Sequence, residues 1–196
     1  MTTTLRRTIA PTAYPVTIQE AMTHCRQADY SDEVVEEMAR LIAAATEHAE
    51  SVSRRSFLTQ TWELTLSDWP SDDVIRLPRP PILASPAPVV QYVDSNGDTQ
   101  TLDAANYLLN THGARITLAH NQSWPDVREQ DNAVTITYTA GYGATHDAVP
   151  QLIRQAVLSI VVHWYDFRGE ILTGTIQSGL PLASQTILMQ ERSNHE

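Results

Sequence analysis

The chain has 196 residues, of which 42% are hydrophobic and 18% charged, and its formal net charge is −10. This composition is typical of a folded globular protein and excludes an intrinsically disordered chain. The acidic balance argues against a protein that grips nucleic acid, because neutralising phosphates requires clustered basic side chains.

An acidic surface is compatible with a channel through which DNA slides without sticking. Cys25 is the single cysteine, so no intrachain disulfide can form. The first eleven residues lack the apolar stretch of a signal peptide, and no window approaches the ~20 apolar residues of a membrane span. We therefore expect a soluble protein made in the cytoplasm, with no membrane contact.

The N-terminal part begins with a polar segment and continues with two helices. Residues 1–14 show no periodicity, so we expect a flexible arm or an arm ordered by a partner. A single domain is expected over residues 15–169. Thr17 and Glu20 fit a capping box and predict a helix over 17–27. A longer amphipathic helix is predicted over 32–54, with this apolar stripe: Val34, Met38, Leu41, Ile42, Ala45, Ala49 and Val52.

A β-rich insertion is predicted over residues 60–140, with six or seven short and mostly antiparallel strands. Apolar and polar residues alternate from Trp62 to Ser67, which indicates a half-buried strand. Asn96-Gly97 is a strong hairpin-turn dipeptide, and a second hairpin is expected through His112-Gly113. The expected strands are 62–67, 74–77, 89–93, 99–102, 107–109, 115–118 and 134–139.

The chain then returns to a helix, predicted over 149–168, with Asp147 as its cap and Pro150 in its first turn. Its apolar residues cover more than one stripe, so we expect it to be buried on two sides, by its own sheet and by a neighbouring subunit. The residues that we assign to the core or to a subunit interface are Ile160, His163, Trp164 and Tyr165.

Residues 170–196 form the expected C-terminal arm. Apolar side chains are scattered among small polar ones, too irregularly to predict a long independent helix. Such a segment either orders on a partner or packs back on its own domain, and we favour the partner.

The sequence contains no pattern that predicts catalysis, a metal or a cofactor. There is no His-x-x-x-His, no cysteine pair and no Gly-x-Ser-x-Gly elbow. Gly141-Tyr142-Gly143 lacks the third glycine and the lysine of a phosphate loop. Trp69 and Trp124 are interpreted as loop anchors that fill either the edge of their own core or a pocket on a partner. We therefore expect a protein that is not an enzyme and binds no cofactor.

Several segments follow one another in a recognisable order. They are the helix running into 54–64, the proline cluster 77–81, the strand and glycines 134–143, the helix from 149–156 to 163–165, and Leu180-Pro181-Leu182 in the tail. Over about Pro15 to Arg192, this order resembles the head–tail connector (adaptor) family of tailed bacteriophages and gene-transfer agents.

The resemblance implies an α+β fold, with helices from both chain ends, a mostly antiparallel β-rich insertion and an extended C-terminal arm. It implies a structural virion protein at the head–tail junction, a cyclic ring of about twelve copies under the portal. The tail-side stopper or tail terminator would meet the opposite face, and DNA would pass through the lumen without specific binding. The residues implied to bind the portal are Leu180, Pro181, Leu182, Ile187, Leu188, Met189 and Arg192. Two alternatives stay open: a soluble ligand-binding module and a small enzyme of unknown class.

Overall fold

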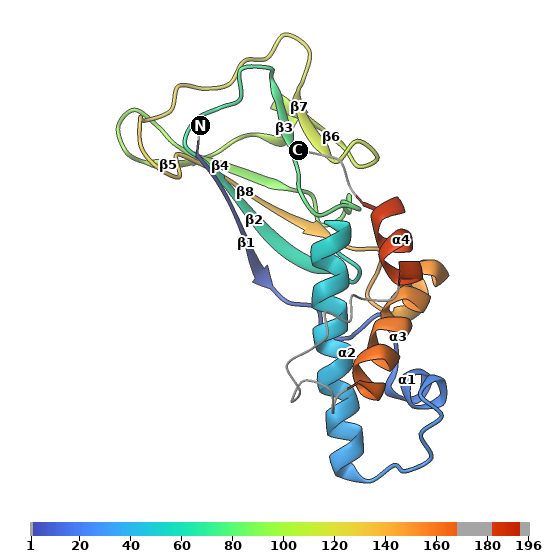
Figure 1. Cartoon of the computed structure of the whole chain (residues 1–196). Helices are drawn as coiled ribbons and strands as arrows, with labels where there is room; N and C mark the ends of the chain where they lie inside the picture. The colour runs from blue at the N-terminus through green and yellow to red at the C-terminus, as the bar shows by residue number, and fades with distance from the viewer. Residues whose placement is uncertain (1, 168–181, 193–196) are drawn as a thin grey trace. The chain divides into compact units, whose positions relative to one another are not determined.

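The computed structural model describes residues 2–167 and 182–192, and the chain divides into two compact units (Figure 1). The β unit comprises residues 2–11 and 59–141. The helical unit comprises residues 12–58, 142–167 and 182–192. The sequence predicted one domain over 15–169, but each unit has its own hydrophobic core, so the two are described separately.

The β unit consists of two antiparallel sheets (Figure 1). The five-stranded sheet has the order β1 (Thr3–Ile9), β2 (Gln60–Leu66), β8 (Val134–Ala140), β4 (Val89–Val93), β5 (Thr99–Thr101). The three-stranded sheet has the order β3 (Val74–Arg76), β7 (Arg115–Leu118), β6 (Tyr107–Asn110), and the short 3-10 helix η1 (Ala104–Asn106) precedes β6.

The predicted alternation in β2 sets the side of the sheet that faces the core. Trp62, Leu64 and Leu66 are buried, while the residues between them are half-buried. Across the ladder between β2 and β8, Leu64 pairs with Ile136. Tyr138 lies in the same core, donates a hydrogen bond of 2.7 Å to the carbonyl oxygen of Pro78, and has its pKa raised strongly by burial. Side chains of both sheets meet in this single core.

Strand β1 was not predicted, because residues 1–14 were expected to form a flexible or partner-ordered arm. The strand pairs with β2 from Thr3 opposite Leu66 to Arg7 opposite Trp62, with a register shift before Ile9. Most of its side chains are exposed, and only Leu5 packs against the core. Pairing with β2 orders this segment. No alternation of apolar residues marks residues 1–14 as a strand, so the strand was not predictable from the local sequence.

Both predicted hairpins are confirmed. Strands β4 and β5 are joined through Asn96-Gly97, where Gly97 adopts a φ of +95° that favours glycine. Asp94 accepts hydrogen bonds from the backbone N–H groups of Asn96 and Asp98. Hydrogen bonds from the Gln100 side chain and from this backbone hold the pKa of Asp94 below its ordinary value. The second hairpin joins β6 to β7.

The helical unit contains α1 (Ile18–His24), α2 (Asp32–Ser53), α3 (Gln151–Asp166), α4 (Leu182–Gln190) and the short 3-10 helix η2 (His146–Ala148). The first three helices lie within the predicted ranges. Pro150 is the N-cap of α3, while Asp147 lies in η2 and does not cap the helix as expected. The α+β class is confirmed. No helix in the described part of the chain is long and apolar enough to span a membrane.

The end of α2 is held by a buried carboxylate. Arg54 closes the helix in the left-handed conformation, at a φ of 55°. Glu50, which is buried one turn earlier, accepts a hydrogen bond of 2.7 Å from the backbone N–H of Phe57. Phe57 is fully buried in the core of the helical unit, so this bond fixes where the chain leaves the helix.

Helix α4 occupies part of the segment expected to be an extended arm. It contacts both α2 and α3, and Leu188 lies in the core of the unit. The remaining residues of the expected arm, 170–181 and 193–196, lie outside the described residues. Over residues 182–190, the chain packs back on its own domain, which was the second of the two alternatives left open by the sequence.

Candidate functional site

One face of α4 exposes apolar side chains in the segment that the resemblance assigned to partner binding. Leu182 is 81% exposed and Met189 is 55% exposed. These two residues line a shallow depression together with the uncharged Gln185, Thr186 and Gln190. We call this surface the α4 face. Exposed apolar side chains in an uncharged setting are typical of a protein contact surface.

The other residues assigned to portal binding are placed differently. Leu188 is fully buried in the core of its own unit, so its side chain cannot also fill a groove on a partner in this fold. Ile187 is half-buried against the same core, and Arg192 is half-buried. Leu180 and Pro181 lie outside the described residues.

The backbone that follows α4 is tied to the end of α2. The guanidinium of Arg55 donates from Nε to the carbonyl oxygen of Glu191. Burial raises the pKa of the nearby Tyr142 hydroxyl, although the charge of Arg55 acts in the opposite direction. Together with Leu188, this bond makes α4 part of the folded unit rather than a segment added to it.

The four residues of α3 that were assigned to the core or to a subunit interface differ in burial. Ile160 is fully buried. Trp164 is half-buried and meets the His48 ring of α2 edge-on, with ring centroids 6.0 Å apart. The rings of His163 and Phe167 lie side by side, with centroids 4.8 Å apart. The Tyr165 hydroxyl accepts a hydrogen bond of 2.5 Å from the side-chain amide of Gln27. Ile160 is therefore a core residue, while the other three keep partly exposed surface.

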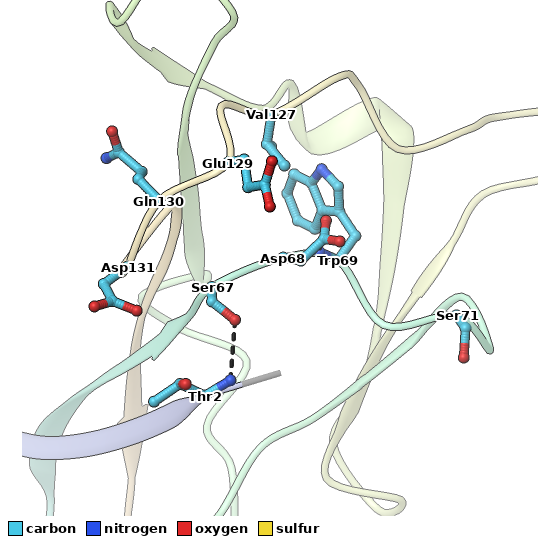
Figure 2. A pocket seen from close by; sticks show the side chains of 9 residues that line it. All are labelled: Thr2, Ser67, Asp68, Trp69, Ser71, Val127, Glu129, Gln130 and Asp131. Atoms are coloured by element: carbon cyan, nitrogen blue, oxygen red, sulfur yellow. Dashed lines mark hydrogen bonds between the residues drawn. The ribbon is translucent and has the colours of Figure 1, made fainter.

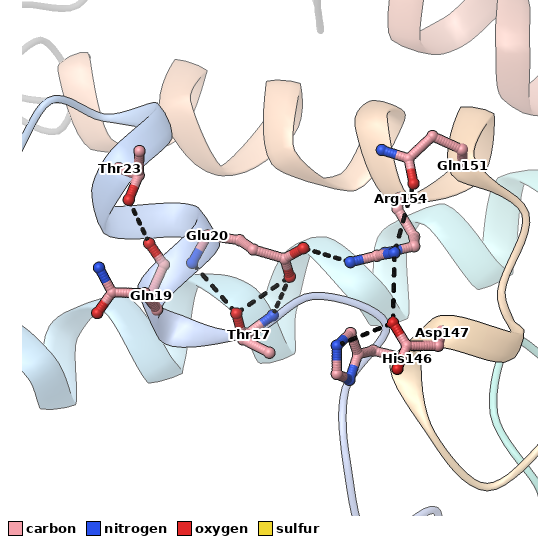
Figure 3. Close-up of polar contacts among 8 residues, drawn as sticks. All are labelled: Thr17, Gln19, Glu20, Thr23, His146, Asp147, Gln151 and Arg154. Atoms are coloured by element: carbon pink, nitrogen blue, oxygen red, sulfur yellow. Dashed lines mark hydrogen bonds and ion pairs between the residues drawn. The ribbon is translucent and has the colours of Figure 1, made fainter.

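A charged cluster joins α1 to the start of α3 (Figure 3). Thr17 and Glu20 form the predicted capping box, and the Glu20 carboxylate also pairs with the guanidinium of Arg154. Asp147 of η2 lies 3.9 Å from the same guanidinium and 3.3 Å from Nε2 of His146. The sequence did not single out Arg154, because its acidic partner lies 134 residues away.

The carboxylate of Glu20 stays ionised more readily than an ordinary glutamate. Burial by itself raises the pKa of this group. Hydrogen bonds from the backbone and hydroxyl of Thr17 and the charge of Arg154 outweigh burial, so the pKa of Glu20 lies below its ordinary value. A carboxylate so fully paired is suited to fixing helices in place, not to abstracting protons.

The β unit contains an open pocket beside the start of β1 (Figure 2). The Trp69 indole forms part of its wall and stacks on Trp124, with ring centroids 4.4 Å apart and planes inclined by 7°. Both rings pack against the β core, which decides for the first of the two alternatives left open for these loop anchors. The carboxylates of Asp68, Glu129 and Asp131 also line the pocket. Among the described residues, no group of three or more His, Cys, Asp or Glu side chains could hold a metal ion.

No protein-family model and no curated protein matches the sequence. Solved structures do match. A chain in the neck of an empty GTA particle, computed with C6 symmetry, gives a TM-score of 0.77 at 20% identity, over 97% of this chain and 95% of that chain. A chain in the virion of the native gene transfer agent (GTA) particle gives 0.75 at 21% identity, over 96% and 95%. The chain has the fold of a GTA particle protein.

A third match, in the neck of a native GTA particle computed with C12 symmetry, gives a TM-score of 0.73 at 20% identity, over 97% and 95% of the two chains. At this identity the similarity establishes the fold. The fold implied by the sequence resemblance is thus confirmed, and both units of this GTA-type fold are included in the match. The sequence alone does not distinguish Leu182 from Leu188, so the burial of Leu188 in the core could be recognised only from the folded structure.

Proposed function

We propose that this chain is a structural virion protein that forms a ring at the head–tail junction, beneath the portal, and continues the DNA channel into the tail. The observation that carries the proposal is the match to neck chains, which extends over nearly the full length of both proteins. Both neck structures are computed with cyclic symmetry, C6 and C12, which supports a closed ring of about twelve copies.

The proposed mechanism is assembly and sealing, with no bond-breaking chemistry. The portal protein would contact the α4 face, and the tail-side stopper or tail terminator would contact the opposite side of the ring. Leu182 and Met189 support the portal contact through their exposure, and we extend the contact to Leu180 and Pro181 by the sequence resemblance. Repetition around a ring makes a modest contact per copy into a firm attachment.

The net charge of −10 supports a passive channel. DNA that passes through an acidic ring is not held by phosphate contacts, so its movement is not slowed by the wall. We propose that the protein is made in the host bacterial cytoplasm and functions in the virion at the head–tail junction.

The test is complementation in a particle-producing strain from which the gene for this chain has been deleted. Without the protein, we expect DNA-filled heads that lack tails, counted by electron microscopy. The double variant Leu182→Glu, Met189→Glu should reproduce this defect, because charges on the α4 face oppose burial against a partner.

Ile9→Glu is the matched control, because Ile9 is 62% exposed on β1, in the β unit and outside the α4 face. It should restore tailed particles. Tailed particles in normal number without the protein would overturn the proposal. Tailed particles with the double variant would overturn the portal contact alone.

A further inference from the structure

Helix α4, which carries the α4 face, depends on other elements for its order. It is nine residues long, and an isolated helix of that length is unstable in water. Leu188 attaches it to the core of the helical unit, and Arg55 binds the backbone just after the helix ends. The apolar contact holds one side of the helix, whereas the polar contact holds its C-terminal end.

The contact with Arg55 is the polar attachment of α4. Nε of Arg55 donates to the carbonyl oxygen of Glu191, the residue that follows the helix. Over residues 2–167 and 182–192, no other hydrogen bond or ion pair joins α4 to another element. The hydroxyl of Ser184 is buried on α4 without a hydrogen-bond partner in that part of the chain. Removing the Arg55 side chain therefore leaves α4 attached by apolar packing alone.

The charge of Arg55 suits the end of the helix that it binds. The last carbonyl groups of a helix have no intrahelical partners and carry a partial negative charge, so a cation beside them is stabilising. The last turn of α4 contains no basic residue of its own. Arg55, which lies just after α2, supplies both the cation and the hydrogen-bond donor from a distant part of the chain.

Arg55 lies at a junction of two segments of the helical unit. It belongs to residues 54–58, through which the chain leaves the unit, and Tyr142 is the residue at which the chain returns. The Tyr142 hydroxyl lies beside the guanidinium of Arg55. Both backbone groups of Phe57 are hydrogen-bonded, its N–H to the Glu50 carboxylate at 2.7 Å and its carbonyl oxygen to the N–H of Tyr142 at 3.1 Å. Since Phe57 is also fully buried, Arg55 extends from a firmly held part of the unit.

We infer that Arg55 is a positioning residue of the α4 face, because it fastens the end of α4 to this junction. The inference rests on the proposed portal contact and names the residue that prepares the face for it. Met189 lies in the last turn, beside the anchored end, while Leu182 begins the helix. Without the anchor, the spacing of these two exposed side chains is no longer fixed. A surface that must be ordered during binding holds its partner less tightly.

Hydrogen exchange of the free chain, followed by mass spectrometry, tests the anchor without any partner. Arg55→Met keeps most of the apolar length of the side chain and removes the donor and the charge. Exchange over residues 186–191 should become about tenfold faster or more, while exchange over α2 should stay as in the wild type.

Arg40→Met is the matched control, because Arg40 is an exposed arginine of α2 that pairs with Glu36 at 3.7 Å. This variant should leave exchange over residues 186–191 unchanged. Unchanged exchange there in Arg55→Met would overturn the inference. Equal acceleration over α2 and residues 186–191 would also overturn it, because Arg55 would then support the whole unit and not α4 in particular.

Complementation tests what the anchor does for the α4 face. Arg55→Met should lower the fraction of tailed particles about tenfold. Arg55→Lys should restore about half of that fraction or more, because a single carbonyl oxygen needs a cationic donor and not the guanidinium fork. A lysine variant as defective as the methionine variant would overturn the positioning role. Faster exchange of α4 with normal tailing would refute the portal contact and leave the anchor standing, so the two failures are distinguishable.

Discussion

The two leucines at either end of α4 give a sharp test of how this helix is used. Leu188 is fully buried in the core of the helical unit, while Leu182 on the same helix is 81% exposed. Replacing a buried leucine with alanine costs about 2–5 kcal/mol, and the cost is smaller where neighbours can close the cavity. Because α4 is a nine-residue helix, we expect the lower half of that range, about 2–3 kcal/mol, for Leu188→Ala.

Leu182→Ala is the matched control and should change the free energy of unfolding by no more than ~0.5 kcal/mol. The assay is urea unfolding followed by circular dichroism at the helical signal, which reports on the unit that contains α4. In complementation, the order of the two effects should reverse for the protein that folds. Leu182→Ala should weaken head–tail joining more than Leu188→Ala does, although it causes no loss of stability. Equal destabilisation by the two variants, or none by Leu188→Ala, would refute the packing of α4 described above.

Four further predictions concern the helical unit and the charge of the chain. Truncation after Gly179 should destabilise the helical unit, measured by thermal unfolding, because it removes Leu188 and the Arg55–Glu191 contact; a fully stable truncate would contradict this. Trp164→Ala should cost less than the ~3–5 kcal/mol of a fully buried tryptophan, since Trp164 is half-buried, and a larger loss in urea unfolding would show deeper burial. The lowered pKa of Glu20 contributes to the free energy of unfolding above the ordinary glutamate pKa of about 4.3, and this contribution is lost as the pH falls through the folded value. Glu20→Gln should therefore flatten the plot of unfolding free energy against pH in this range. An unchanged plot would count against the Glu20–Arg154 pair. The free chain should not bind duplex DNA appreciably at physiological salt, and a salt-dependent sub-micromolar affinity in a gel shift would refute the passive channel.

Elements with a strong local signal were predictable from the sequence. The apolar stripe of α2 and the turn at Asn96-Gly97 each fix a structure within a few residues, without help from distant parts of the chain. Strand β1 was not predictable in this way, because nearly all its side chains are exposed and its order comes from pairing with β2. The α4 helix was missed because its apolar residues do not form one clear stripe.

The candidate surfaces required the fold for the same reason. The alternation at Thr135 and Thr137 was visible as a strand, but which residues of β2 and β4 lie beside them depends on the register of the sheet. The Glu20–Arg154 pair joins positions far apart in the chain, and no local pattern indicates it. Local sequence patterns predict which residues alternate along a strand, whereas tertiary packing determines which side chains remain exposed to a partner.

The most direct test of the proposed function is a cryo-EM reconstruction of the neck of the particles that this chain's producing strain releases. We expect a closed ring of this chain, of about twelve copies, between the portal and the first tail protein, with the α4 face toward the portal. A neck of the same particles in which another protein forms that ring, with this chain absent, would contradict it.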